Sequence, residues 1–435
     1  MRGVVAIVGR PNVGKSSLFN RIIGDRVSIT DDASGITRDR IYGKASWLNQ
    51  EFRLIDTGGI ILKDEPFSKE IRAQASLAID EADVIIMVVD VRASITIEDE
   101  DVINILYRSN KPVIIAVNKV DNNELLGLTY DFYSLGIGDI FPVSALHGIG
   151  IGDLLDRVIE LLPEERKDLY REGTIKFCLI GQPNVGKSTL SNTIVGEERT
   201  IVSSIPGTTR DAIDIVFTRN ARKFVVIDTA GIRKQGKIYE NAEKYSVLRA
   251  LSAIERSDIA VLILDGTEEL SEQDKRIAGY AREANRAIII VVNKWDIVVK
   301  DDKTMQRLTE KIKAQMPFLD FAPIIFLSAY KKERVHTLLD EIVKVYENFN
   351  RRVQTSVLND VLLDAVLLNQ PPVFNGNRLR LNYATQEDVM PPSFVLFVND
   401  EKHMHFSYLR YLENKLRESF DFSGSPIKFI LRKKE

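Results

Sequence analysis

The pattern Gly-x-x-x-x-Gly-Lys-Ser occurs twice in this chain of 435 residues, as GRPNVGKS (9–16) and as GQPNVGKS (181–188). A loop with this spacing turns backbone N–H groups toward a β-phosphate, its lysine reaches the outer phosphates, and its serine hydroxyl ligates Mg²⁺. Each copy lies between an apolar run and a predicted helix, whose N-terminus favours anions. The two helices are expected to end at Gly24 and Gly196, because glycine is favoured just past a helix C-terminus. The chain is therefore predicted to hold two nucleoside triphosphate sites. The residues assigned to the loops are Gly9, Asn12, Val13, Gly14, Lys15, Ser16 and Ser17, and Gly181, Asn184, Val185, Gly186, Lys187, Ser188 and Thr189.

Four further short motifs recur in the same order in both halves of the chain. They are GITRD (35–39) and GTTRD (207–211), DTGG (56–59) and DTAG (228–231), NKVD (118–121) and NKWD (293–296), and the Ser-Ala pairs at 144–145 and 328–329. The first two pairs keep the 172-residue offset of the phosphate loops, and the offset then grows slowly. A period this long exceeds the roughly 20–50 residues of stacked repeats, so it indicates a duplicated domain.

Apolar runs typical of strands alternate with helical stretches in both halves. They read RLID, DVIIMVVD and PVIIAVN in the first half, and FVVID, DIAVLILD and AIIIVVN in the second. Such runs suit parallel strands covered on both faces, and the alternation predicts two tandem doubly wound α/β domains with ligands at the carboxyl ends of the strands. The expected organisation is a first P-loop domain over 1–162, a charged linker over 163–173, a second P-loop domain over 174–350 and a small α+β domain over 351–435.

The tail breaks this alternation. It reads helix (353–368), strand (379–383), strand (394–398), helix (406–420) and strand (427–431). Its 12 Lys and Arg residues against 10 Asp and Glu residues give a net charge of +2, which by itself does not decide whether the tail binds nucleic acid. Before the tail, a helix over 335–350 is expected to close the second domain.

Three positions after each phosphate loop carry the chemistry of a γ-phosphate switch. Asp56 and Asp228 each end an apolar strand, where a carboxylate can hold Mg²⁺ through water. The glycines that follow permit close approach to a γ-phosphate, and the threonines of GITRD and GTTRD can contact Mg²⁺ only while that phosphate is present. The predicted metal ligands are Ser16, Thr37, Asp56, Ser188, Thr209 and Asp228, and the predicted catalytic residues are Lys15, Thr37, Gly59, Lys187, Thr209 and Gly231.

The NKVD and NKWD motifs predict which base is bound. Asp121 and Asp296 can accept hydrogen bonds from the N1–H and 2-amino donors of guanine, whereas adenine has no matching donors. Asn118 and Asn293 can contact the base edge or brace the phosphate loop. The remaining candidates are Lys119 and Lys294, whose stems can cover the ring, and Ser144, Ala145, Ser328 and Ala329, which offer N–H groups to the guanine oxygen. The sequence thus predicts GTP and GDP as ligands.

The residue after Asp-x-x-Gly sets an expectation for the rate of hydrolysis. In signalling GTPases a glutamine at this position orients the attacking water, but here Ile60 and Ile232 can neither orient nor polarise water. Intrinsic hydrolysis is therefore expected to be slow. Asn12 and Asn184 can help to hold a monovalent cation near the transferring phosphate, or they can brace the loop, and both roles stay open here.

Composition excludes several classes of protein. The net charge of −3 excludes a globally basic nucleic-acid binder, and we expect no DNA partner. The single cysteine, Cys178, lies in an apolar run and is expected to be a buried strand residue rather than part of a disulfide framework. Apolar stretches such as residues 84–89 are much shorter than the ~20 residues of a membrane helix, and the N-terminus begins directly with a strand. We expect a cytoplasmic monomer that does not bind membranes.

The tandem GxPNVGKS, GxTRD, DTxG, NKxD and SA motifs, followed by a short α+β tail, resemble the Der (EngA) family of bacterial GTPases over essentially the whole chain. The resemblance implies two GTPase domains, a C-terminal KH-like domain, and a role in assembly of the large ribosomal subunit, with its rRNA as a partner. It also implies stimulation by K⁺ through Asn12 and Asn184. The tail holds only Gly376 and Gly424, so it lacks the Gly-x-x-Gly loop of typical KH domains. RNA contact by the tail and packing between the GTPase domains are therefore both open.

Two other functions compete with a GTP-driven switch at this point. A phosphotransferase would hand the γ-phosphate to a small acceptor, but no motif for an acceptor base is present in the chain. A static scaffold would bind guanine nucleotide without turnover, and Ile60 and Ile232 are the residues that favour it.

Overall fold

The structure is a computed structural model that describes residues 2–24, 42–56, 82–163, 173–197, 214–227, 253–374 and 377–433, together with Ile79, Tyr170 and residues 250–251. Contacts divide the chain into two compact units, Met1–Leu169 and Tyr170–Glu435. Among the described residues, no helix has the length and apolar character needed to cross a membrane.

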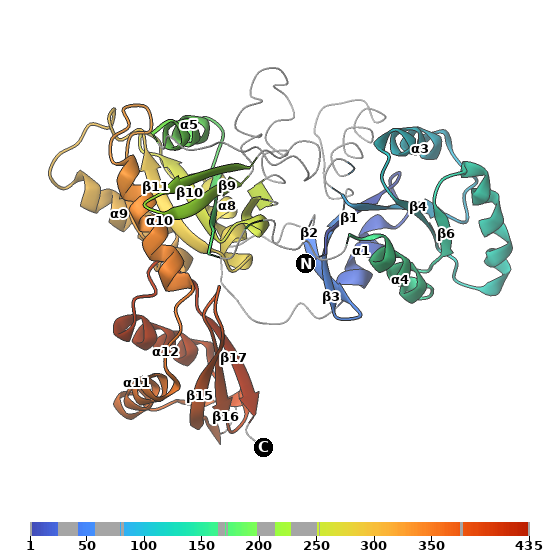
Figure 1. The fold of residues 1–435 in the computed structure, drawn as a ribbon. Coiled ribbons are helices and arrows are strands. Elements are labelled where there is room, and N and C mark those ends of the chain that lie inside the picture. The colour runs from blue at the N-terminus through green and yellow to red at the C-terminus, as the bar shows by residue number, and fades with distance from the viewer. Residues whose placement is uncertain are drawn as a thin grey trace. The chain divides into compact units, whose positions relative to one another are not determined.

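The first unit is a six-stranded sheet with helices on both faces (Figure 1). Its elements are β1 (Val4–Val8), α1 (Lys15–Ile23), β2 (Tyr42–Trp47), β3 (Gln50–Asp56), β4 (Val84–Asp90), α3 (Ile97–Ser109), β5 (Val113–Asn118), the 3₁₀ helix η2 (Asn123–Leu135), β6 (Asp139–Pro142) and α4 (Ile151–Leu161). The strand order is β2-β3-β1-β4-β5-β6, and every pair except β2–β3 is parallel. Buried side chains of α1 and α4 pack on one face of the sheet, and α3 lies on the other.

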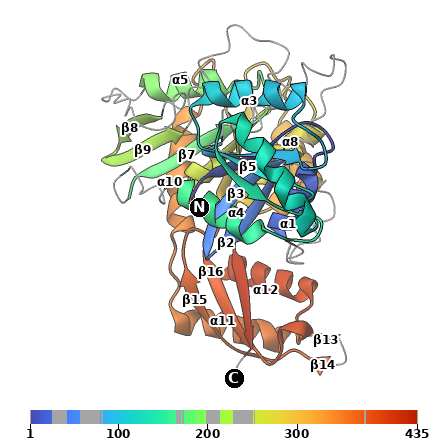
Figure 2. The ribbon, with the colours of Figure 1, turned by 90° about the vertical axis from the view of Figure 1, so that its right-hand side faces the viewer.

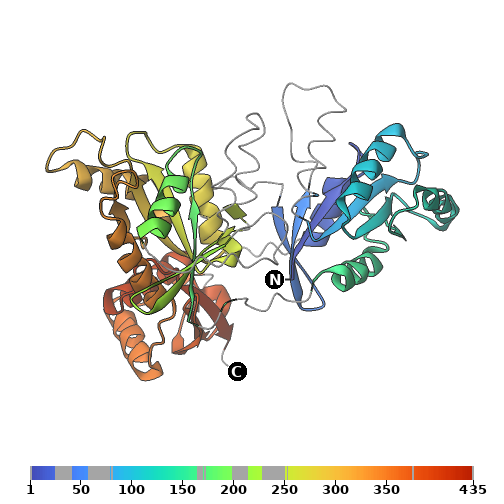
Figure 3. The same ribbon diagram turned by 45° about the horizontal axis from the view of Figure 1, so that its top comes forward.

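The second unit begins with a domain of the same design. Its elements are β7 (Ile175–Ile180), α5 (Lys187–Glu197), β8 (Ile215–Arg219), β9 (Arg222–Ile227), β10 (Ile259–Asp265), α8 (Glu272–Glu283), β11 (Ala287–Asn293), α9 (Thr304–Gln315), the 3₁₀ helix η3 (Pro317–Leu319), β12 (Ile324–Phe326) and α10 (Val335–Phe349). The strand order β12-β11-β10-β7-β9-β8 repeats that of the first domain. Helices lie on both faces of this sheet (Figure 3). One core joins the sheet to α5 and α10, and the other joins it to α8 and α9. Cys178 is fully buried in the second core, as predicted.

Both sheets differ from the predicted parallel pattern at one edge, where an antiparallel hairpin is added. β2 pairs with β3, and β8 pairs with β9, each through a two-residue turn. Both turn residues have positive φ in each case, 47° and 62° at Leu48 and Asn49, and 49° and 62° at Asn220 and Ala221. This is the geometry of a type I′ turn. Neither turn carries the Asn-Gly or Asp-Gly sequence that would have indicated it.

The chain ends in a small α+β domain with two helices on one face of a three-stranded sheet (Figure 2). Its elements are α11 (Thr355–Leu368), β13 (Val373–Phe374), β14 (Asn377–Arg378), β15 (Leu381–Asp388), β16 (Ser393–Val398), the 3₁₀ helix η4 (Glu401–His403), α12 (Phe406–Ser419) and β17 (Lys428–Lys433). β16 pairs antiparallel with β15 and parallel with β17. The predicted order of elements is confirmed, and the short hairpin β13–β14 is an addition.

Residues 421–425 attach this domain to the sheet before it through backbone hydrogen bonds. The Gly424 N–H donates to the carbonyl of Phe321, and the Gly424 carbonyl accepts from the N–H of Ile288, both at 2.8 Å. A Cβ on Gly424 would lie 2.5 Å from Val345 of α10, and its φ is +75°, so only glycine suits this close approach. Because Ile288 lies at the start of β11, the attachment is at the opposite end of the strand from NKWD.

Polar and aromatic contacts extend the attachment around this loop. The Asp421 carboxylate accepts a 3.1 Å hydrogen bond from the amide of the buried Asn348 and forms a 3.2 Å ion pair with Lys344. The guanidinium of Arg417, in α12, lies 4.9 Å from the centre of the Phe321 ring and donates to two carbonyls of the 421–425 loop. These contacts join the second sheet and the C-terminal domain into one packed body.

The C-terminal ends of α1 and α5 test the prediction that a glycine ends the helix after each phosphate loop. α1 ends at Ile23, and Gly24 follows with φ 72°, as predicted. α5 runs through Gly196 to Glu197, so the stop predicted at Gly196 is wrong. A glycine inside a helix costs only about 1 kcal/mol relative to alanine, which does not force a helix to end.

Candidate nucleotide-binding sites

The first phosphate loop leads from β1 into α1, and two of its glycines have no room for a side chain. Gly9 has φ +145°, and a Cβ there would lie 2.4 Å from the carbonyl oxygen of Val88. Gly14 has φ +98°, and a Cβ there would lie 2.2 Å from the amide nitrogen of Asn118. The backbone can therefore curl tightly beneath a bound phosphate group and present its N–H groups.

Asn118, at the end of β5, ties this loop to the Ser-Ala segment. The side chain is 3% exposed. Its Nδ2 donates to the carbonyl of Val13 at 2.8 Å, and its Oδ1 accepts from the N–H of Ala145 at 2.9 Å. Of the two roles open for Asn118, the structure shows the brace. The N–H groups predicted to face the guanine oxygen already have partners here: Ala145 donates to Asn118, and Ser144 donates to the carbonyl of Ile149 at 3.0 Å.

The second site repeats this brace bond for bond. Asn293, at the end of β11, donates to the carbonyl of Val185 at 2.8 Å and accepts from the N–H of Ala329 at 2.9 Å. Gly186 has φ +99°, and a Cβ there would lie 2.2 Å from the Asn293 amide nitrogen. The duplication therefore preserves the positions of side-chain atoms as well as the order of motifs.

Two aspartates that the sequence reasoning did not single out hold the lysines of NKVD and NKWD. Lys119 Nζ lies 2.5 Å from Asp90 Oδ2 and donates to the Asn12 carbonyl at 3.1 Å. Lys294 Nζ lies 2.5 Å from Asp265 Oδ2. Each aspartate is the last residue of the strand next to the one that ends in the asparagine. Asp90 pairs in register with Asn118, and Asp265 pairs with Asn293. In the sequence, the feature that could have indicated these residues is the aspartate that ends each apolar run, VIIMVVD and AVLILD.

The aspartates predicted to select the base accept from the serines of the Ser-Ala pairs. Ser144 Oγ donates to Asp121 Oδ1 at 2.7 Å, and this bond is the largest cause of a pKa of Asp121 below its ordinary value. The Ser328 hydroxyl likewise lowers the pKa of Asp296. Both carboxylates are therefore ionised at neutral pH and can accept hydrogen bonds from a base.

The lysines of the two phosphate loops are folded back onto their own loops. Lys15 Nζ donates to the Arg10 carbonyl at 2.8 Å, and Lys187 Nζ donates to the Gly181 carbonyl at 2.8 Å. Burial lowers the pKa of Lys15, and it lowers the pKa of Lys187 to about 8. Desolvation disfavours the ammonium form, and an anionic ligand beside it would restore that form.

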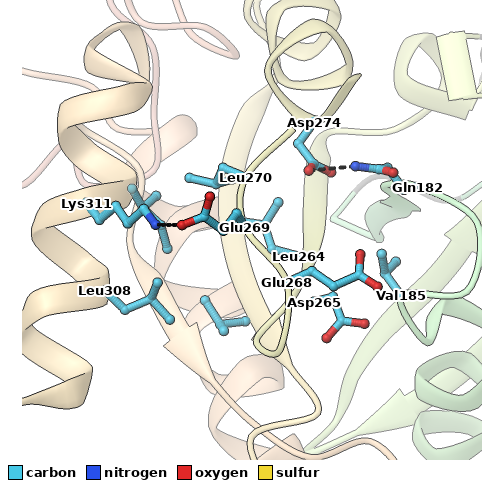
Figure 4. A pocket seen from close by; sticks show the side chains of 12 residues that line it. Gln182, Val185, Leu264, Asp265, Glu268, Glu269, Leu270, Asp274, Leu308 and Lys311 are labelled. Carbon is cyan, nitrogen blue, oxygen red and sulfur yellow. Dashed lines mark hydrogen bonds and ion pairs between the residues drawn. The ribbon is translucent and has the colours of Figure 1, made fainter. Parts of the chain in front are cut away.

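The second residue of each phosphate loop connects the loop to a helix, α3 in the first domain and α8 in the second. Each of these helices follows the strand, β4 or β10, that lies beside the strand before the loop. Arg10 Nε lies 3.4 Å from Asp99 Oδ2 in the first site. Gln182 Nε2 donates to Asp274 Oδ2 at 2.7 Å in the second (Figure 4). Asp99 and Asp274 are also the N3 residues of the capping boxes that begin α3 and α8, so the same carboxylate fixes a helix start and the loop.

The described residues bring most predicted site residues together at the carboxyl edge of each sheet. Ser16 and Ser17 lie in the first turn of α1, Ser188 and Thr189 in that of α5, and Asp56 ends β3 with 1% of its surface exposed. The predicted residues Thr37, Gly59, Thr209, Asp228 and Gly231, and the isoleucines at 60 and 232, lie outside the described residues.

Each half of the chain has a six-stranded sheet of this order, a glycine-rich phosphate loop braced by the asparagine of NKxD, and the aspartate of the same motif. These features define a tandem P-loop GTPase. The family described as "50S ribosome-binding GTPase" matches residues 4–119 and 176–294, and "KH-domain-like of EngA bacterial GTPase enzymes, C-terminal" matches residues 352–432. "GTPase Der" of Bacillus cytotoxicus is 59% identical over 432 residues, 99% of each chain, and that of Geobacillus sp. is 60% identical over 429 residues, 99% of this chain and 98% of the relative. The chain belongs to the Der (EngA) family of GTPases.

Membership confirms the predicted fold class and activity. The chain has two GTP-binding P-loop domains followed by a KH-like α+β domain, and it hydrolyses GTP. The phosphotransferase and the static scaffold are therefore not needed to explain the motifs.

Proposed function

We propose that each domain binds one GTP with Mg²⁺, through the residues predicted from the sequence. The braced loop geometry, identical at both sites, is the observation that supports this assignment. The main-chain N–H groups of each loop would surround the phosphates, Asp121 and Asp296 would bind guanine, and Lys119 and Lys294 would cover its ring.

The donors at the first phosphate site fit a magnesium ion. Asp56 is a buried carboxylate at the end of β3, close enough to Lys15 to raise the lysine's pKa against the effect of burial. Ser16 offers a hydroxyl in the first turn of α1. Hard oxygen donors of this kind are what Mg²⁺ prefers, and the ion would neutralise charge on the β- and γ-phosphates. We propose Ser16, Thr37 and Asp56 as its ligands, with Ser188, Thr209 and Asp228 at the second site.

Hydrolysis at both sites is proposed to be slow without K⁺. Asn12 and Asn184 both have φ 65°, and both side chains are exposed. Neither side chain has a hydrogen-bond partner among the residues that the structure describes, so the loop-bracing role lacks support from it. Their amide oxygens remain available to a monovalent cation beside the phosphates, where added positive charge would stabilise the transition state.

The pKa of Lys187 gives a prediction about proton uptake. Bound phosphates favour the charged lysine, so binding raises a pKa that lies at about 8 in the free site. GDP binding should therefore be accompanied by proton uptake that grows with pH. The number of protons taken up per site should be on the order of 0.7 at about pH 8.5 and about 0.1 at pH 7. Calorimetry in buffers of different ionisation enthalpy measures this number, with the first site disabled by Asp121→Asn.

Lys187→Arg is the control for proton uptake, because a guanidinium stays charged throughout this range. Uptake at the higher pH should disappear in this variant while GDP still binds. Equal uptake in both proteins would show that another group takes the proton.

We infer that the protein acts on the large ribosomal subunit in the cytoplasm as a monomer, with rRNA as a partner. The description of the matching family supports the part of this proposal that concerns the large subunit. The charged segment over 163–173 is proposed as the linker between domains over 1–162 and 174–350, with the KH-like domain over 351–435. RNA contact and packing between domains remain two proposals for the KH-like domain.

Binding to purified large subunits should depend on the nucleotide. The γ-phosphate orders segments that relax after hydrolysis, so a non-hydrolysable GTP analogue should support binding at least about tenfold tighter than GDP. Sedimentation with ribosomal subunits measures it, and a protein carrying Asp121→Asn and Asp296→Asn should show no dependence on guanine nucleotide. Equal binding with GTP analogue, GDP and no nucleotide would refute a nucleotide-controlled switch.

A further inference from the structure

The two sites differ at one position beside the base-selecting aspartate. Asp90 and Asp265 hold equivalent lysines, and two residues further on the chain has Arg92 in the first domain and Thr267 in the second. The backbone N–H groups of Arg92 and Thr267 donate to Asp90 and Asp265 at 3.0 and 2.9 Å. The two residues therefore occupy the same backbone position and differ only in side chain.

In the first site, both carboxylate oxygens of Asp121 already have partners. Arg92 Nη2 lies 2.6 Å from Oδ2, and Ser144 Oγ donates to Oδ1 at 2.7 Å. His147 Nε2 lies 3.9 Å from Oδ1. Arg92 remains 59% exposed and Asp121 23% exposed, so the guanidinium covers the side of the carboxylate that faces solvent.

The second site has no such ion pair among the described residues. Asp296 accepts from the Ser328 hydroxyl, and the charges of Lys331 and Lys300 help to lower its pKa, but no described basic side chain forms an ion pair with it. Thr267 turns its hydroxyl to Asp265 at 2.6 Å. The next two residues are Glu268 and Glu269, and Figure 4 shows Glu269 paired with Lys311 and Glu268 near Asp265. This segment is acidic, whereas the two residues after Arg92 are uncharged.

We propose that Arg92 competes with guanine for Asp121 and so weakens guanine-nucleotide binding at the first site alone. This inference rests on the proposed role of Asp121 in binding the base. The N1–H and 2-amino donors of guanine approach the same carboxylate oxygens, and Arg92 already takes acceptor capacity on Oδ2 that the base would otherwise use. Thr267 takes none from the second site. Arg92 therefore weakens nucleotide affinity at the first site through its base pocket and not through its phosphate loop.

The test replaces Arg92 by the residue of the other domain. GDP affinity of the first site is measured by calorimetry on the full chain carrying Asp296→Asn, which disables base recognition at the second site. Arg92→Thr should tighten GDP binding about two- to fivefold, the range expected for a largely exposed ion pair. Arg108→Thr, which removes an equal charge from the exposed surface of α3, should leave affinity unchanged. Unchanged or weaker GDP binding in the Arg92→Thr protein would overturn the proposal.

A second arm separates competition at Asp121 from a general effect of charge. In this arm Asp296 is left in place and position 121 carries asparagine, so xanthosine diphosphate binds only the first site, and the arginine has no carboxylate to pair with. Arg92→Thr should then leave xanthosine diphosphate affinity unchanged; a tightening equal to that for GDP would refute the competition. If Asp121→Asn fails to weaken GDP binding at all, the proposed role of Asp121 is wrong, whereas failure of Arg92→Thr alone leaves that role intact.

Discussion

Asp121→Asn will remove guanine-nucleotide binding from the first site, and Asp296→Asn will remove it from the second. Asparagine presents one acceptor and one donor where guanine needs two acceptors, so the base would meet an unpaired donor in a partly buried site. We expect each substitution to weaken GTP at its own site by at least about a hundredfold, because sites that hydrogen-bond their ligand discriminate by such factors. Calorimetry should find the number of GTP molecules bound per chain fall from two to one.

Xanthosine triphosphate provides the control for these variants. Xanthine carries a carbonyl in place of the 2-amino group of guanine, so the asparagine amide can donate to it and accept from N1–H. Each variant should therefore bind one GTP and one xanthosine triphosphate, and the double variant only the latter. If GTP binding survives at both sites in the double variant, the assignment of Asp121 and Asp296 to the base is wrong.

Gly14→Ala and Gly186→Ala will each disable the phosphate loop of one domain. A Cβ at either position would lie 2.2 Å from the amide nitrogen of the bracing asparagine, and φ is +98° and +99°. Neither the loop nor the asparagine can give way, because the same amide fixes the Ser-Ala segment. We expect GDP affinity at the affected site to fall by about a hundredfold or more, since strain and a displaced buried hydrogen bond together amount to several kcal/mol.

Gly196→Ala is the matched control for Gly186→Ala. Gly186 directly precedes α5, and Gly196 lies within the last turn of the same helix. No atom would lie within 4 Å of a Cβ added at Gly196. Alanine there should leave GDP binding unchanged and raise helix stability by about 0.5–1 kcal/mol, measured by urea unfolding. An equal loss of binding from both alanines would mean that α5, and not the loop geometry, limits the site.

The sequence predicted a helix or strand correctly where the residues within that segment are enough to determine its structure. The uninterrupted runs that become β4, β5, β10 and β11 are buried as expected, and the tail follows its predicted order of helices and strands. The added edge strands were not predicted, because their turns at Leu48-Asn49 and Asn220-Ala221 lack the usual glycine.

Features that need two neighbouring strands could not be predicted from one segment. The pairing of Lys119 with Asp90 depends on β4 lying beside β5 in a particular register. The choice between two roles for Asn118 likewise required the distance from its amide to Val13. Motifs identified which residues mattered, and tertiary packing determined what they contact.

The loop of residues 421–425 has a consequence for how shortened proteins should be interpreted. Cutting the chain after residue 350 would remove the hydrogen bond that the Ile288 N–H donates to Gly424. It would also expose Phe321 and Val345, which this loop region contacts. A fragment of this kind loses part of the support for β11, the strand whose other end carries Asn293. Lower activity in such a fragment would therefore report a weakened second domain as readily as a missing partner contact.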